Sequence, residues 1–110
     1  MLNYMEEITN LLKENDKVVI KFTAEWCNPC KRAAPFINKH LPNLPSNVKY
    51  FEIDIDESLD LYATLKGKRI ISGIPSLVCY KKDNDTLYPD FCISSSDENS
   101  INTFFDHIQK

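Results

Sequence analysis

Glycine, basic clusters and long apolar runs are all scarce in this sequence. Its 110 residues include 2 Gly against 6 Pro, which excludes a collagen-like or low-complexity chain. No apolar run approaches the roughly 18 to 20 residues that a membrane-spanning helix needs, and residues 1–9 are too acidic for a signal peptide. The net charge of -3, with no basic cluster, argues against a nucleic-acid ligand, because such binding depends on neutralising phosphates. We therefore expect a cytoplasmic protein without membrane contact, whose partners are proteins or small molecules.

The composition is that of one compact domain. The residues are 43% hydrophobic and 11% aromatic, enough for a core that folds without structural metals or disulfides. We therefore expect a single domain over residues 1–110. Without an export signal, the four cysteines are expected in a reducing compartment, where cysteine is catalytic, metal-binding or incidental.

Hydrophobic periodicity predicts helices that alternate with strands. Apolar residues three or four apart, from Leu2 to Leu12, predict a first helix. Short apolar or β-branched runs predict strands over residues 18–23, 48–54, 76–81 and 87–93. Further helices are predicted over 29–40, interrupted by Pro35, over 58–66, and after a capping box at 95–98. This order predicts an α/β fold in which helices cover both faces of a mixed sheet of about four strands.

One short motif, Cys27-Asn28-Pro29-Cys30, carries the chemistry. It follows a buried-looking strand and opens a helix, so Cys27 lies at a helix N-terminus, where free N–H groups and the helix dipole stabilise a thiolate. Two intervening residues bring the second sulfur within bonding reach. We expect Cys27 to be the more exposed nucleophile and Cys30 to resolve the mixed disulfide. Pro29 fits the first helical turn, where its missing N–H costs little.

These residues resemble the active site of the thioredoxin family. The match covers nearly the whole chain, in order, and consists of Ala24 to Lys31, Pro35, Ile53 to Glu57, and Gly73 to Ser76. The resemblance implies a thioredoxin fold, a three-layer α/β/α sandwich, that catalyses dithiol–disulfide exchange. It also implies a cis Ile74-Pro75 bond beside the active sulfurs and a substrate chain that pairs with the Ile74 backbone. The substrate-contacting residues it implies are Trp26, Asn28, Pro29, Ile74 and Pro75.

The sequence also departs from the family pattern. Asn28 stands where thioredoxins usually have glycine, the chain before Trp26 is too short for the family's first edge strand, and the stretch before Pro75 is a few residues longer than usual. Lys21 occupies the position of the family's buried acid, and Glu52 that of its lysine partner. We expect the same pair with its charges exchanged, because an unpaired buried lysine would be costly. Glu52 would then be the base for Cys30, and Lys21 would favour the thiolates.

The other charged and sulfur-containing residues have more than one interpretation. A structural zinc site normally needs four ligands, and no second C-x-x-C or His pair follows, so we expect no metal. Cys79 is expected in the core. Cys92, which the resemblance places near the substrate groove, could be a regulatory thiol or could pair with Cys79 across the hairpin. The charges between Lys66 and Arg69 fit a solvated loop or a surface that selects partners.

The sequence thus predicts an enzyme that reduces protein disulfides. Cys27 and Cys30 would cycle between dithiol and disulfide, and the resemblance implies electrons from a partner reductase or from glutathione. We expect a monomer without a cofactor, since no Gly-rich phosphate loop or dinucleotide fingerprint is present. One alternative is a disulfide oxidase or isomerase, because stabilising the thiolate makes the disulfide more oxidising. Another is a binding module of the same fold in which the cysteines are incidental.

Overall fold

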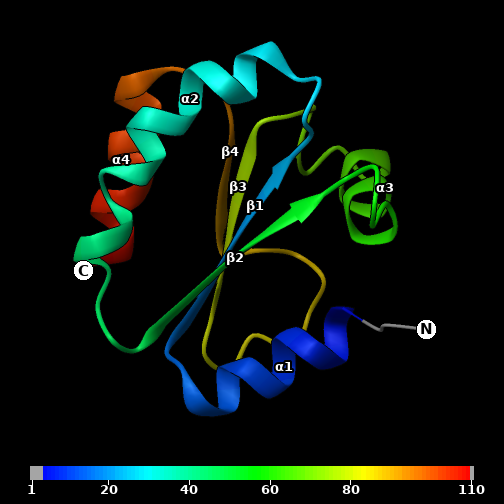
Figure 1. Cartoon of the computed structure of the whole chain (residues 1–110). Helices are drawn as coiled ribbons and strands as arrows, with labels where there is room; N and C mark the ends of the chain where they lie inside the picture. The colour runs from blue at the N-terminus through cyan, green and yellow to red at the C-terminus, as the bar shows by residue number, and fades with distance from the viewer. Residues whose placement is uncertain (1–3, 110) are drawn as a thin grey trace.

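The computed structural model describes residues 4–109. Helices and strands alternate along the chain and end in a hairpin and a last helix (Figure 1). The elements are α1 (Tyr4–Glu14), β1 (Lys17–Thr23), α2 (Asn28–Asn38), the 3-10 helix η1 (Leu41–Asn43), β2 (Val48–Asp54), α3 (Asp60–Gly67), β3 (Ser76–Lys81), β4 (Phe91–Ser94) and α4 (Glu98–Gln109). Within residues 4–109, no helix is both long and apolar enough to cross a bilayer. Leu2, which the periodicity assigns to the first helix, lies outside the described residues.

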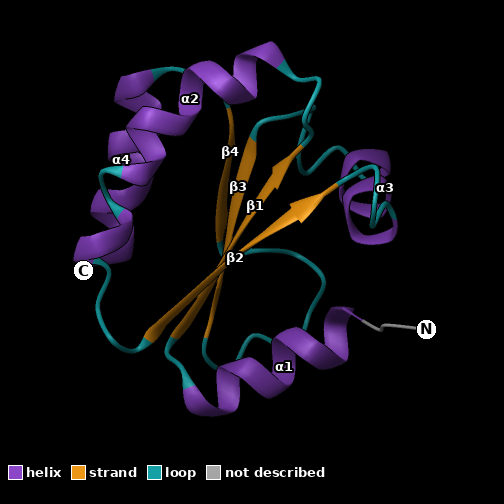
Figure 2. Ribbon diagram, in the orientation of Figure 1, coloured by secondary structure: helices purple, strands orange, loops and turns teal. Residues whose placement is uncertain are grey.

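The four strands form one mixed sheet in the order β2-β1-β3-β4 (Figure 2). β1 is parallel to β2 and antiparallel to β3, and β3 is antiparallel to β4. Five successive residues of β1, from Val18 to Phe22, are buried, as a central strand covered on both faces requires. No strand precedes β1 in the part of the chain that the structure describes, so β2 forms an edge of the sheet. The sheet has the expected four strands.

Helices cover both faces of the sheet. Val18, Ile20 and Phe22 pack in one cluster with apolar residues of α1 and α3, whereas Val19 packs in a second cluster with residues of α2 and α4. In Figure 1, α2 and α4 lie together on one side of the strands and α3 lies on the other. This is the expected three-layer α/β/α sandwich, and it leaves the C-terminal end of β1 free to lead into α2.

Several boundaries differ from the prediction: α2 runs through Pro35 without the expected interruption and ends at Asn38, and α3 begins at Asp60. Two further differences have local reasons. The last strand begins at Phe91 because the Asn84 side chain holds the preceding residues in a turn, donating to the Tyr88 carbonyl at 2.9 Å and accepting from the Thr86 N–H at 2.8 Å. α4 is capped by Asp97, and not by the predicted Ser95: the Asp97 carboxylate accepts the Ser100 N–H at 3.0 Å. In both places, side-chain to backbone hydrogen bonds displace the predicted pattern.

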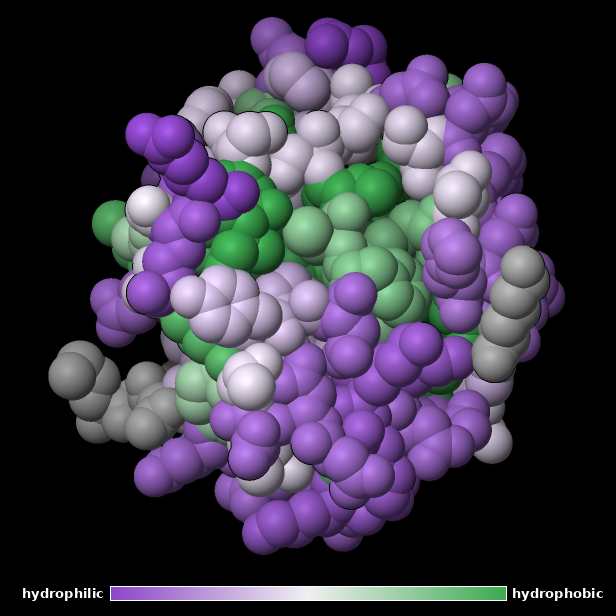
Figure 3. All heavy atoms as spheres, turned by 180° about the vertical axis from the view of Figure 1, so that it is seen from behind, coloured by the Kyte–Doolittle hydropathy of each residue, from purple (hydrophilic) through white to green (hydrophobic). Residues whose placement is uncertain are grey.

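One face of the molecule carries an apolar surface. Seen from behind, hydrophobic side chains gather in the middle, with hydrophilic side chains on both sides (Figure 3). The edge strand β4 contributes only half-buried apolar residues, Phe91 to Ile93.

Candidate active site

The motif around Cys27 lies between the end of β1 and the first turn of α2. Cys27 has an extended backbone, with φ -86° and ψ 104°, and its sulfur caps the helix by accepting the Cys30 N–H at 3.2 Å. Pro29 lies in the first helical turn, as predicted. The Cys27 sulfur therefore sits at the positive end of the α2 dipole, where a thiolate is stabilised.

Cys27 and Cys30 are joined by a disulfide, and their Cα atoms are 5.2 Å apart. Both residues are 3% exposed. The expectation that Cys27 is the more exposed of the two is therefore wrong for this oxidised form. The Cys27 sulfur lies 3.9 Å from the carbonyl oxygen of Ile74, which covers it on that side. Asn28, between them, is exposed.

The segment opposite the disulfide contains the predicted cis bond between Ile74 and Pro75. Pro75 is buried and Ile74 half-buried. The Ser76 hydroxyl donates to the Gly73 carbonyl, and its oxygen lies 2.8 Å from that of the Ser94 hydroxyl. The Ser94 oxygen also accepts the backbone N–H of Ser72 at 3.0 Å. These polar contacts fix residues 72–76 against β4 and hold Ile74 beside the Cys27 sulfur.

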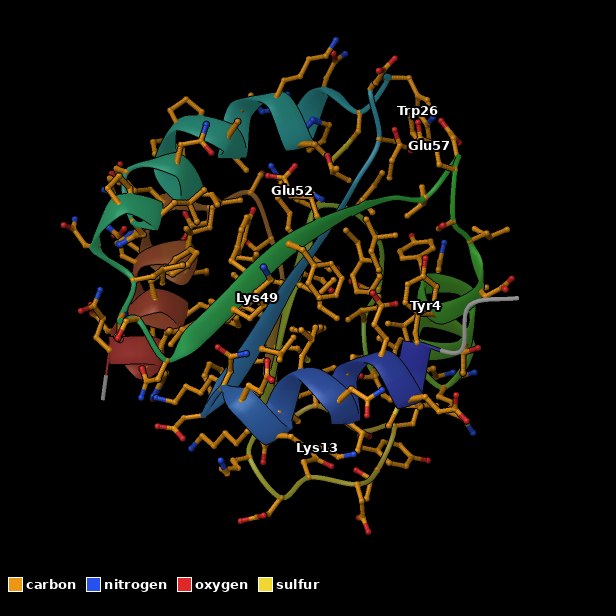
Figure 4. All side chains as sticks on the ribbon, turned by 60° about the horizontal axis from the view of Figure 1, so that its bottom comes forward. Tyr4, Lys13, Trp26, Lys49, Glu52 and Glu57 are labelled. Atoms are coloured by element: carbon orange, nitrogen blue, oxygen red, sulfur yellow. A yellow bond between two sulfur atoms is a disulfide. The ribbon has the colours of Figure 1, made fainter. Side chains whose placement is uncertain are left out.

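Trp26 forms an exposed surface next to the disulfide. It is 63% exposed, so it is not a core residue. Its indole Nε1 donates to Asp56 Oδ2 at 2.7 Å, and the Asp56 N–H in turn donates to Asp54 Oδ1 at 2.9 Å. Trp26 and Glu57 lie at the same end of the molecule (Figure 4). The fixed indole presents a flat apolar face to any partner that approaches the sulfurs.

The structure brings Lys21 and Glu52 together. They are register partners on β1 and β2, and Lys21 Nζ lies 3.8 Å from Glu52 Oε2. Lys21 is buried at 5% exposure, whereas the Glu52 side chain is 45% exposed at the sheet edge. The same Glu52 oxygen accepts the Tyr50 hydroxyl at 3.0 Å. Burial, and then the Glu52 carboxylate, raise the pKa of Tyr50 well above its ordinary value, so Tyr50 stays a neutral donor.

Cys79 and Cys92 do not face each other. Cys79 is opposite Phe91 and Cys92 opposite Val78, so the two thiols point to opposite faces of the sheet, and the alternative of a bond between them is wrong. Cys79 is fully buried, as expected, and burial raises its pKa to about 12. The half-buried Cys92 thiol lies 3.4 Å from the Ile70 carbonyl oxygen, and burial raises its pKa as well.

Sequence reasoning missed Asp56, the partner of the Trp26 indole, and Ser94, which holds the segment around the cis bond. Asp56 belongs to the segment Ile53 to Glu57, which matches the family pattern but gives Asp56 no role of its own. Ser94 is opposite Ser76 in the β3–β4 register. Two polar residues facing each other across a hairpin would have been a signal, had the last strand been placed correctly.

The mixed sheet carries a C-x-x-C cysteine pair at a helix N-terminus, and this pair faces a cis-proline. This is the arrangement of a thiol–disulfide oxidoreductase. A model of the family described as thioredoxin matches residues 2–107. The chain belongs to the thioredoxin family.

Several known proteins are similar to this chain. Mitochondrial thioredoxin-3 of Saccharomyces cerevisiae is 43% identical over 60 residues, which cover 54% of this chain and 46% of that protein. A thioredoxin of Mycoplasma pneumoniae is 32% identical over 81 residues, which cover 74% of each chain. The crystal structure of oxidised yeast mitochondrial thioredoxin 3 superposes with a TM-score of 0.69 at 29% identity, covering 94% of this chain and 89% of that one. The match to the first of these relatives spans less than half of its length.

Proposed function

We propose that this protein reduces disulfide bonds in other proteins through the Cys27–Cys30 couple. The observation that carries the proposal is the couple itself: two cysteines joined at the start of α2, with the Cys27 sulfur against Ile74 of the cis bond. One domain of residues 1–110 is sufficient for this chemistry, acting as a monomer. A partner reductase or glutathione would return it to the dithiol form. The cytoplasmic location stays a prediction, since one yeast relative is named mitochondrial.

The reaction needs two exchange steps. The Cys27 thiolate attacks one sulfur of the substrate disulfide, forms a mixed disulfide and releases the first substrate thiolate. The Cys30 thiol then loses its proton and attacks the Cys27 sulfur, which releases the second substrate thiolate and closes the Cys27–Cys30 disulfide. Two electrons pass from the protein to the substrate, and the released thiolates take up protons from water or from a nearby acid.

Lys21 and Glu52 are proposed to serve the second step. Lys21 is buried, and we expect its charge to favour the thiolates of the couple. The Glu52 carboxylate, 3.8 Å from Lys21 Nζ and partly open to solvent, is the candidate acceptor for the Cys30 proton. Glu52→Gln keeps the shape and the Tyr50 hydrogen bond but removes the base. We expect it to slow exchange at neutral pH, and an unchanged rate would exclude Glu52 as the base.

The substrate would lie between Trp26 and the cis bond. Ile74 is half-buried, and its backbone is expected to pair with the substrate chain. Pro29 is half-buried and Pro75 buried, and both are expected to shape the substrate site. Asn28 is exposed between the two cysteines and would contact the substrate directly. Trp26 supplies the apolar face on the other side.

A synthetic peptide closed by one disulfide tests the proposal. The reduced protein should open it, and Cys30→Ser should accumulate a mixed disulfide that mass spectrometry detects on Cys27. Cys27→Ser should do neither, and Cys92→Ser is the matched control, expected to keep the activity. Reduction retained by Cys27→Ser would contradict Cys27 as the nucleophile, and failure of the unmodified protein to open the peptide would favour the binding-module alternative.

A disulfide oxidase or isomerase is the second candidate, favoured by one observation. Lys21 is a cation where the family usually has an acid, and a cation stabilises the reduced thiolates, which raises the reduction potential. The Glu52 carboxylate offsets that charge. We therefore favour the reductase.

A further inference from the structure

The end of α3 carries an unneutralised positive charge. Lys66, Lys68 and Arg69 are all exposed, and the chain contains no Asp or Glu between Leu61 and Lys81. Within residues 4–109 none of the three has an acidic partner within ion-pair distance. Lys66 Nζ lies 5.8 Å above the Tyr62 ring, which leaves its charge available at the surface.

Arg69 closes α3 in a conformation that favours glycine. Its φ is 61°, and it ends the helix in a Schellman motif: the Arg69 N–H donates to the Lys66 carbonyl at 3.0 Å, and the Ile70 N–H donates to the Leu65 carbonyl at 2.9 Å. A side chain with a Cβ is strained at this position. Gly67 lies two residues earlier, inside α3, where that freedom is not needed. A cationic residue therefore occupies a position where glycine would make the fold more stable.

A short, fixed segment joins this charge to the active site. The Ile70 carbonyl contacts the Cys92 thiol, the Ser72 N–H donates to Ser94, and the segment then reaches Ile74 beside the Cys27 sulfur. Six residues lead from Arg69 to Pro75 and span at most about 20 Å. A substrate chain bound at the disulfide can therefore reach Arg69 with residues about four to six positions from its own cysteine.

We propose that Lys68 and Arg69, supported by Lys66, bind acidic residues of the substrate protein that lie a few positions from its disulfide. The proposal rests on the proposed function and names the substrates of the same site. The surface beside Trp26 is acidic, because Glu25, Asp56 and Glu57 are exposed there. Acidic residues of a substrate are attracted to the basic end of α3 and repelled by the acids beside Trp26, so the two charged surfaces favour one placement of the substrate chain.

Three synthetic disulfide peptides test this proposal. They differ only at positions four to six residues from one cysteine, which carry Glu, Gln or Lys. The protein should reduce the Glu peptide with a kcat/KM about three- to tenfold above that for the Lys peptide, the range expected for two or three exposed ion pairs. The preference should shrink in 1 M NaCl, where the Debye length falls to about 3 Å.

Charge variants identify the residues responsible. The preference should be lost in Lys68→Gln/Arg69→Gln and kept in Arg69→Lys, which retains the charge. The matched control is Lys13→Gln/Lys49→Gln, which removes the same charge from α1 and β2; both lysines lie well away from Trp26 (Figure 4). A control that loses the preference as fully as the test variant would show an effect of net charge and overturn the proposal.

The outcomes separate this proposal from the proposed function. Equal kcat/KM for the three peptides, or a preference unchanged in Lys68→Gln/Arg69→Gln, would overturn the proposal that Lys68 and Arg69 bind acidic residues. Neither result would contradict the proposed reductase activity. Failure of the unmodified protein to reduce even the Gln peptide would overturn the reductase and, with it, this proposal.

Discussion

The pair formed by Lys21 and Glu52 should stabilise the fold more than a surface ion pair does. At their 3.8 Å separation, two unit charges attract by about 1 kcal/mol in water and about 4 kcal/mol at an effective dielectric constant of 20. Lys21 is buried, but the Glu52 side chain is 45% exposed, so the coupling should lie near the lower end, at about 1–2 kcal/mol. Lys21→Met and Glu52→Gln, alone and together, form a double-mutant cycle that isolates this coupling from other losses.

The chain supplies a matched comparison in Lys39 and Glu98. Their charged atoms are also 3.8 Å apart, but the two side chains are 48% and 51% exposed. The coupling of this pair, measured by urea unfolding of its own cycle, should stay below about 0.5 kcal/mol. A Lys21–Glu52 coupling no larger than that of Lys39–Glu98 would refute the idea that burial strengthens the exchanged pair.

Three further predictions concern stability and thiol reactivity. Arg69→Gly should raise the unfolding free energy by about 0.5–1 kcal/mol, because glycine removes the strain at φ 61°; a lower melting temperature would contradict this. Burial raises the pKa of Cys79 to about 12, so its neutral thiol contributes fully to the free energy of unfolding below about pH 9, and this contribution is lost as the pH rises towards 12. In Cys79→Ala, the free energy of unfolding measured by denaturation should therefore fall less between about pH 9 and pH 12. After reduction, iodoacetamide at pH 7 should label Cys27 well before Cys92, as peptide mass spectrometry can show.

Much of the fold follows from the sequence because periodicity and burial agree. β1 is nearly continuous in apolar character and is a central strand. The apolar residues of α4 are spaced at helical intervals, and Ile101 and Phe104 are among those that are buried. The start of β4 could not be predicted in the same way. Hydrogen bonds of the Asn84 side chain decide it, and hydrophobic pattern carries no information about such contacts.

The candidate site was predictable where chemistry and spacing coincide. The cysteine motif, the cis bond before Pro75 and the meeting of Lys21 with Glu52 all followed from residue types at fixed positions. The equal burial of the two cysteines did not, because it depends on how closely Ile74 approaches the Cys27 sulfur in three dimensions. The sequence also does not predict that Arg69 ends α3 in a left-handed conformation, because glycine is the usual residue there and Gly67 lies nearby.

The reduction potential of the Cys27–Cys30 couple tests the central claim most directly. The purified protein would be equilibrated in glutathione buffers of graded potential, and the dithiol fraction would be measured after acid quenching and alkylation. A protein that reduces disulfides should have a potential near that of thioredoxin, about -270 mV, which requires Glu52 to offset the charge of Lys21. A value near about -180 mV, typical of protein disulfide isomerase, would contradict the account and show that the exchanged pair has turned the site towards making or rearranging disulfides.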